Sequence, residues 1–257
     1  MRQLVINILF CAFLLTGCAG RPAAPNGNGH YRNNRPALPT GGGNNSSKPT
    51  RPAASSEKGG TKVSSNVSSA KMSGQEVFKK CNSAVFMIFT STGYEGYQGS
   101  GFFISSDGLA VSNYHVFEGT GMGLETIKLV DDRQFKIKEV IRKDKENDVM
   151  IFRVALSSNS KCNYIPLSNR KPQVGDKVYA IGSPRGLENT FSSGEVSQLR
   201  ESNLIQISAP IDHGSSGGAL INEYGEAIGI TSAGLDYSGA NLNFAVSTDV
   251  VKRYVKR

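Results

Sequence analysis

A serine set among glycines near the C-terminal end is the residue best suited to act as a nucleophile. Residues 211–220 read IDHGSSGGAL and end in an apolar stretch that predicts a short strand. Gly214 lets the backbone turn so that its own N–H and that of Ser216 point at one spot, and the two glycines that follow leave room for a carbonyl. The segment predicts a serine nucleophile beside an oxyanion hole, provided that a base and an acid lie elsewhere.

The base is sought among three histidines, His30, His115 and His213. His30 lies in a low-complexity stretch, and His213 is in the same tight turn as Ser216, which is a poor place from which to serve as its base. His115 ends residues 99–115, which read as two strands joined by a turn at 106–108. His115 is therefore the expected base.

The acid that would orient this histidine is expected at Asp148. A polar turn delivers Asp148 immediately before the apolar run 149–154, which predicts a buried strand. A carboxylate there can accept a proton from one imidazole nitrogen and leave the other free as a base. The three groups need neither a metal nor a cofactor, so none is expected.

Six segments together resemble the trypsin-like (chymotrypsin-fold) serine proteases, most closely the HtrA/DegP-type branch. They are GSGF at 99–102, SNYH at 112–115, NDV at 147–149, AIGSP at 180–184, SGGAL at 216–220 and LNFAV at 242–246. Two residues depart from the HtrA pattern: Ser215 stands where Asn is usual, and His213 where Pro is usual. Both lie beside the expected oxyanion hole of Gly214 and Ser216.

The resemblance implies an all-β fold of two six-stranded antiparallel barrels, with the active site between them and short helices at both ends. Strands are expected near 84–90, 99–105, 109–112, 126–130, 134–142 and 149–155, then near 177–182, 191–199, 203–208, 218–221, 227–233 and 242–246. Ser73 and Glu76 fit a capping box, and Thr248 is expected to cap the last helix. That helix is expected to close the chain without a PDZ domain.

The resemblance also implies where a substrate would bind. Pro210 and Ile211 precede the nucleophile by six and five residues, as pocket residues do in trypsin-like enzymes. The strand Ile230-Thr231-Ser232-Ala233 is expected to pair with the substrate backbone. With no Asp at the pocket floor, a small or medium apolar side chain is favoured over Lys or Arg, and His213, Ser232 and Asn243 leave room for a polar one.

The first eighteen residues predict a targeting signal. A basic start precedes the apolar run Leu4 to Leu15, which is too short for a permanent transmembrane helix. Residues 15–18, LTGC, resemble a bacterial lipobox with Cys18 as the lipidated residue. We expect a lipoprotein in a bacterial cell envelope, on the outer membrane if the cell is Gram-negative; an ordinary secretory signal is the alternative.

Residues 19–72 are rich in Gly, Pro, Asn and Ser and predict a disordered linker, which leaves 73–257 as the protease domain. The net charge of +8 is carried by residues 19–80, whereas 18 basic and 19 acidic residues follow from 81 onward. The domain is thus near neutral, and no nucleic-acid partner is expected. The basic linker either stays extended and soluble or lies on an anionic surface.

Export also bears on the cysteines. With Cys11 in the signal and Cys18 lipidated, Cys81 and Cys162 remain as a pair in an oxidising compartment, which favours a disulfide over two separate buried thiols.

Two functions of different class follow. The first is a membrane-anchored serine endopeptidase acting on exported or misfolded proteins or peptides. The second is a catalytically weak peptide-binding scaffold or chaperone on a protease fold. A structural lipoprotein with incidental His, Asp and Ser is remote, because their joint spacing matches one chemistry.

Overall fold

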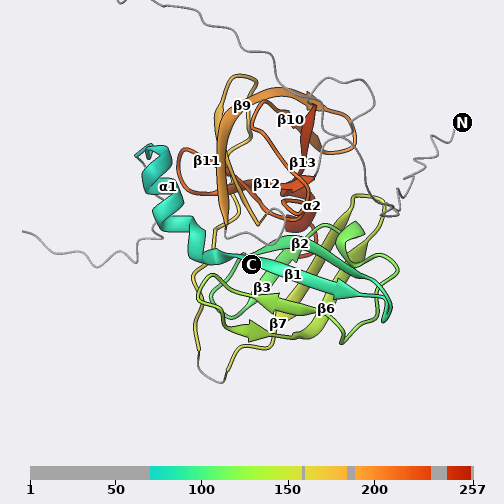
Figure 1. Cartoon of the computed structure of the whole chain (residues 1–257). Helices are drawn as coiled ribbons and strands as arrows, with labels where there is room; N and C mark the ends of the chain where they lie inside the picture. Colours follow the sequence, from blue (N-terminus) through green and yellow to red (C-terminus); the bar gives the residue numbers. More distant parts are fainter. Residues whose placement is uncertain (1–69, 158–159, 184–188, 233–241, 256–257) are drawn as a thin grey trace, which may run out of the picture. The chain divides into compact units, whose positions relative to one another are not determined.

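The structure, a computed structural model, describes residues 70–157, 160–183, 189–232 and 242–255 (Figure 1). The predicted signal peptide, the lipidation site Cys18, most of the predicted linker, and Ala233 lie outside these residues. Within the described ranges no helix is long and apolar enough to cross a bilayer.

The first half of the described chain folds into one curled antiparallel sheet of seven strands, in the order β5-β4-β1-β2-β3-β7-β6. Its strands are rich in aromatic and β-branched residues, which fit a pleated, half-buried surface. Inside the curl, four phenylalanine rings pack with centroids 4.7 to 6.4 Å apart: Phe86, Phe103, Phe117 and Phe152. The strands are β1 (Val85–Ser91), β2 (Gly96–Phe103), β3 (Leu109–Ser112), β4 (Thr126–Lys128), β5 (Gln134–Phe135), β6 (Ile137–Asp144) and β7 (Val149–Val154).

The second half forms a closed six-stranded barrel, in the order β10-β13-β12-β11-β8-β9. The barrel closes where β9 pairs with β10 across a tight turn, in which Ser202 and Asn203 have left-handed φ angles of 61° and 62°. The strands are β8 (Lys177–Gly182), β9 (Thr190–Arg200), β10 (Leu204–Ile207), β11 (Ala219–Asn222), β12 (Ala227–Ser232) and β13 (Asn243–Ser247).

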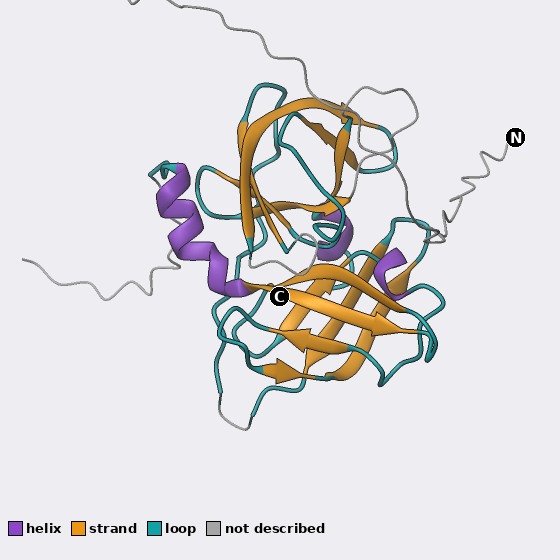
Figure 2. Cartoon of the chain, viewed as in Figure 1, coloured by secondary structure: helices purple, strands orange, loops and turns teal. Residues whose placement is uncertain are grey.

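Short helices flank the strands (Figure 2). In α1 (Gly74–Cys81) the predicted capping box is present, with the Ser73 hydroxyl accepting from Glu76 N–H and the Glu76 carboxylate accepting from Ser73 N–H. In α2 (Asp249–Lys252) the expected cap is wrong, because the Thr248 hydroxyl donates to the Ala227 carbonyl instead. Single 3₁₀ turns lie at η1 (Asn82–Ala84) and η2 (His115–Phe117).

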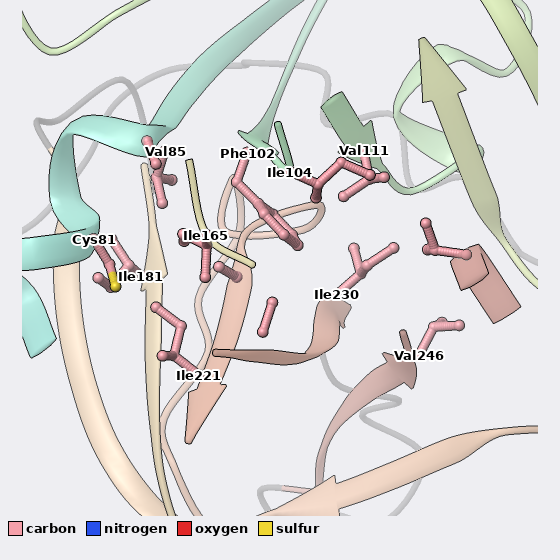
Figure 3. Packing of buried hydrophobic residues seen from close by; sticks show 14 of the residues in the cluster. Cys81, Val85, Phe102, Ile104, Val111, Ile165, Ile181, Ile221, Ile230 and Val246 are labelled. Atoms are coloured by element: carbon pink, nitrogen blue, oxygen red, sulfur yellow. The ribbon is translucent and has the colours of Figure 1, made fainter. Parts of the chain in front are cut away.

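A shared core joins the two sheets (Figure 3). Phe102 and Val111 of the first sheet belong to the same buried cluster as Ile181, Ile221 and Ile230 of the barrel. All five side chains are fully buried. This continuous apolar contact fixes the two sheets against each other, and with them the loops at their common edge.

The all-β fold is confirmed, but the first sheet differs from the expected six-stranded barrel. The strand predicted at 134–142 breaks at Lys136 into β5 and β6, the two edges of the curled sheet. Lys136 C=O accepts from Ala155 N–H (2.9 Å), and Ile137 N–H donates to the Glu125 carboxylate (3.2 Å). Before Lys136 the chain pairs with β4, and after it the chain pairs with β7, so the predicted strand is divided into two.

The predicted Cys81–Cys162 disulfide is wrong, because both cysteines are free thiols. Cys81 ends α1 within the core shared by the two sheets, whereas Cys162 packs against the core of the first sheet, where its thiol donates to the Ser105 carbonyl (3.4 Å). Burial raises the pKa of the Cys81 thiol to about 11 and also raises the pKa of Cys162. Both thiols are therefore protonated at neutral pH and poorly reactive.

We expect iodoacetamide to label Cys81 in the native protein at least about tenfold more slowly than a free peptide thiol, because its buried thiol has a raised pKa. In denaturant without reductant, peptide mapping should find both Cys81 and Cys162 alkylated. Recovery of the two peptides linked to each other would contradict this assignment.

Candidate active site

His115 follows β3 and opens the single turn η2. The next two residues, Val116 and Phe117, are buried in the core of the first sheet, and the Thr90 hydroxyl donates to the Val116 carbonyl (3.0 Å). These contacts fix the backbone at His115, while its imidazole stays 34% exposed. The first sheet thus presents the ring to solvent from a rigid support.

Asp148 ends the turn between β6 and β7 with a φ of 54°, a left-handed conformation that aspartate adopts more readily than most residues. Its Oδ1 accepts from the His115 backbone N–H (2.9 Å), and its Oδ2 lies 2.8 Å from His115 Nδ1. Because a carboxylate only accepts, Nδ1 carries the proton and Nε2 is the ring atom able to take one up.

A second set of contacts supports the turn that carries this acid. The buried Asp144 carboxylate accepts from Asn147 N–H (3.1 Å), from the Asn147 amide (3.0 Å) and from the Tyr254 hydroxyl (2.8 Å). Asn147 also accepts from Asn203 (3.0 Å), which in turn accepts from Arg253 (3.0 Å). Burial raises the pKa of Asp144, but donors from Asn147 and Tyr254 outweigh it and hold the pKa below its usual range.

The serine singled out by its glycine neighbours lies at the end of a tight turn. Ser215 N–H donates to the Asp212 carbonyl (3.0 Å), and Gly214 takes a φ of 92° between them. A positive φ at the third position is that of a type II turn, which selects glycine. Ser216 follows, 6% exposed, before the barrel strand β11.

The peptide that contains Ser216 N–H has a fixed orientation. The Ser215 carbonyl on its other side accepts from Gly218 N–H (3.0 Å) and from the Thr231 hydroxyl (2.7 Å). In a trans peptide the C=O and the N–H point in opposite directions. Ser216 N–H therefore points away from these anchors.

The two halves of the site meet at β2. A methyl group built on Gly99 would lie 2.6 Å from the Val116 side chain and 3.3 Å from the Ser216 carbonyl. The next residue, Ser100, donates its N–H to the same Ser216 carbonyl (2.8 Å). Val116, the neighbour of His115, and the Ser216 carbonyl thus both lie beside Gly99 of β2.

The residues predicted to form a substrate pocket are divided between surface and core. Exposed or half-buried are Pro210, Ile211, His213 and Ser232; buried are Ile230, Thr231 and Asn243. Thr231 donates its N–H to Gly218 O (2.9 Å) and accepts from Gly217 N–H (2.8 Å) at its carbonyl. Both groups are thus bonded to the nucleophile turn, and the pairing of this strand with a substrate backbone stays a prediction. The Thr231 hydroxyl also holds the nucleophile turn, a role that its sequence position gave no sign of.

In the part of the chain that the structure describes, no three His, Cys, Asp or Glu side chains gather as metal ligands. The chemistry that the described contacts offer is proton uptake by an imidazole that a carboxylate orients.

Comparison with known proteins agrees with this geometry. The sequence profile of a family described as "Trypsin-like peptidase domain" matches residues 99–230. A probable periplasmic serine protease (do/HhoA-like) of Haemophilus influenzae is 37% identical over 172 residues, which cover 62% of this chain and 36% of the relative. The periplasmic serine endoprotease DegP of Escherichia coli K12 is 37% identical over 165 residues, or 60% and 34% of the two chains.

Among solved structures, a serine endoprotease from Yersinia pestis superposes with a TM-score of 0.63 at 26% identity, over 72% of this chain and 65% of that one. The matches to the two curated relatives span about a third of their length.

Proposed function

Because this chain belongs to the family of trypsin-like peptidases, we propose that it is a serine endopeptidase that hydrolyses peptide bonds through Ser216, His115 and Asp148. Ser216 is the nucleophile, His115 is the general base and then the general acid, and Asp148 orients the imidazole. Protein or peptide substrates follow from this activity.

The observation that carries the proposal is the double contact of Asp148 with His115. One carboxylate oxygen accepts from the backbone N–H and the other lies at 2.8 Å from Nδ1, so that position and tautomer of the ring are set together. A histidine that merely filled space would have no need of such a partner. A serine protease does, because Nε2 must receive the serine proton and the imidazolium that forms must be stabilised.

In the proposed reaction, Ser216 Oγ attacks the scissile carbonyl while its proton passes to His115 Nε2. The oxyanion that forms is held by the N–H groups of Gly214 and Ser216, which supports catalysis only if both point at the same place. His115 then protonates the leaving amine, and water releases the acyl group by the same steps in reverse order.

For specificity we propose a small or medium apolar side chain at the cleaved position. Pro210 stands where trypsin-like enzymes that select Lys or Arg carry a carboxylate. Pro210 and Ile211 are the proposed walls, and His213, Ser232 and Asn243 are the polar groups at the proposed pocket.

For cellular location we propose the bacterial envelope, with a lipid anchor at Cys18 and the linker 19–72 as a tether for a protease domain at 73–257. The relatives from Haemophilus influenzae and Escherichia coli are named periplasmic, which supports an envelope location. The lipobox-like LTGC at 15–18 supports the anchor, and exported or misfolded proteins would then be the substrates within reach.

Replacing Ser216 or His115 by Ala is expected to lower casein hydrolysis by several orders of magnitude, leaving at most roughly 10³–10⁴-fold acceleration over water from binding and the oxyanion hole. Asp148→Asn should lower kcat by about 10⁴-fold, because an amide favours the wrong imidazole tautomer. Initial rates of the purified variants measure these effects.

Two variants serve as controls. Ser197→Ala removes an exposed hydroxyl on β9 and should keep full activity. His213→Ala should keep most of it, because His213 is exposed and is assigned to the pocket rim. Full activity of Ser216→Ala would refute Ser216 as the nucleophile. An inactive parent that still binds unfolded peptide would instead favour the peptide-binding scaffold.

Cys18→Ser is expected to move the protein from the membrane fraction to the soluble fraction of the cell, because a diacylglyceryl group on this sulfur would be its anchor. Fractionation followed by immunoblotting measures the change, with Cys162→Ser as the matched control that should stay membrane-bound. Unchanged partitioning of Cys18→Ser would refute the anchor.

A further inference from the structure

Ser100 is a fully buried polar residue of β2 that joins the first sheet to the nucleophile turn and to the barrel. Its N–H donates to the Ser216 carbonyl (2.8 Å) and its hydroxyl donates to the Gly214 carbonyl (2.7 Å). The same hydroxyl accepts from Ser183 N–H (2.8 Å), and its carbonyl accepts from the Ser112 hydroxyl (2.7 Å). Every polar group of the residue is therefore used.

The bond to Gly214 matters because that glycine is the one member of the turn with great backbone freedom. The Ser100 hydroxyl has a single proton, and its oxygen uses a lone pair to accept the N–H of Ser183. The proton is thereby left to the Gly214 carbonyl. This bond sets the plane of the peptide that follows Gly214, and the turn bond from Ser215 N–H to Asp212 O holds its other edge.

The next peptide of the nucleophile turn, which joins Ser215 to Ser216, is held by a residue of the barrel. The Thr231 hydroxyl donates to the Ser215 carbonyl (2.7 Å), as described above. Two buried hydroxyls thus hold two successive carbonyls, one from each sheet. Among the contacts of the described residues, removal of Ser100 Oγ leaves the Gly214 carbonyl without a side-chain donor, whereas the Ser215 carbonyl would still accept from Gly218 N–H after removal of Thr231 Oγ1.

We propose that Ser100 is a positioning residue for the oxyanion hole: its hydroxyl holds the Gly214–Ser215 peptide, which links the peptide that carries Gly214 N–H to the peptide that carries Ser216 N–H, so that these two N–H groups converge. The inference rests on the proposed endopeptidase activity and deepens it. Ser100 touches neither substrate nor the reacting atoms. It acts through Gly214, so its loss lowers transition-state binding while ground-state binding stays the same.

The test compares Ser100→Ala with the parent on a peptide substrate and on a peptide aldehyde of the same sequence. When Ser216 Oγ adds to the aldehyde, the new C–O bond forms, the carbonyl π bond breaks to give an oxyanion, and the serine O–H bond breaks as its proton passes to His115 Nε2. The oxyanion needs the same two N–H groups. We expect kcat to fall about 10–100-fold, somewhat less than the loss of a whole oxyanion donor, with KM within about threefold. The aldehyde Ki should rise in parallel with the fall in kcat.

Ser168→Ala is the matched control. Ser168 is a buried serine whose hydroxyl donates to Glu226 (2.7 Å) in the barrel, so this variant also loses a buried hydrogen bond and some thermal stability. Its kcat and aldehyde Ki should stay at parental values. Ser100→Cys keeps a weak donor in the same space, should fold if Ser100→Ala does not, and should fall between parent and Ser100→Ala.

A folded Ser100→Ala or Ser100→Cys with parental kcat and Ki would overturn the proposal while the endopeptidase stands. Equal losses in the Ser168→Ala control would also overturn it, since stability alone would then explain them. A parent that neither cleaves the peptide nor binds the aldehyde would instead refute the proposed activity.

Discussion

The close approach of the β2 backbone to the nucleophile turn is the constraint on which the rest of the site depends. At Gly217 a side chain would meet the Ser100 carbonyl and the Ser112 hydroxyl, and at Gly99 it would meet Val116 and the Ser216 carbonyl. The backbone of β2 therefore lies in direct contact with the backbone of the nucleophile turn, and Ser100 N–H donates to the Ser216 carbonyl (2.8 Å). A shift of either sheet would break this bond and disturb the proposed alignment of Ser216 with His115.

The core shared by the two sheets keeps this contact in place. Phe102 packs in the same cluster as Ile181 and Ile230 of the barrel. This apolar contact lies only two residues along β2 from the hydrogen bonds of Ser100. The chemical groups divide accordingly. The proposed acid–base pair lies on the first sheet, with His115 in η2 and Asp148 just before β7, and the proposed nucleophile, Ser216, precedes β11 of the barrel. Neither sheet holds the whole site, so catalysis and sheet packing are coupled in this account.

The sequence was sufficient to predict what depends on local pattern. Strand positions, the Ser73 capping box and the polar turn before Asp148 follow from periodicity and turn chemistry, and the glycines around Ser216 revealed the turn. It was insufficient for contacts between distant segments. Ser100 was visible only as part of a motif, and its four partners come from three separate stretches of chain. The cysteine pairing failed for the same reason, since the cellular compartment and an even number of cysteines say nothing of the distance between them. The strand break at Lys136 likewise depends on distant contacts, with the end of β7 and with Glu125.

Active-site labelling tests the central claim most directly, because it asks which oxygen of the folded chain is nucleophilic. The intact protein is treated with a fluorophosphonate, digested, and the adduct is located by tandem mass spectrometry, with urea-unfolded protein as the reference. The account predicts one adduct per chain, on Ser216, in the folded protein and none after unfolding, since the hydroxyl is activated only when β2 holds the turn beside His115. An adduct on another residue, equal labelling of the unfolded chain, or a folded protein that takes up no label would contradict it.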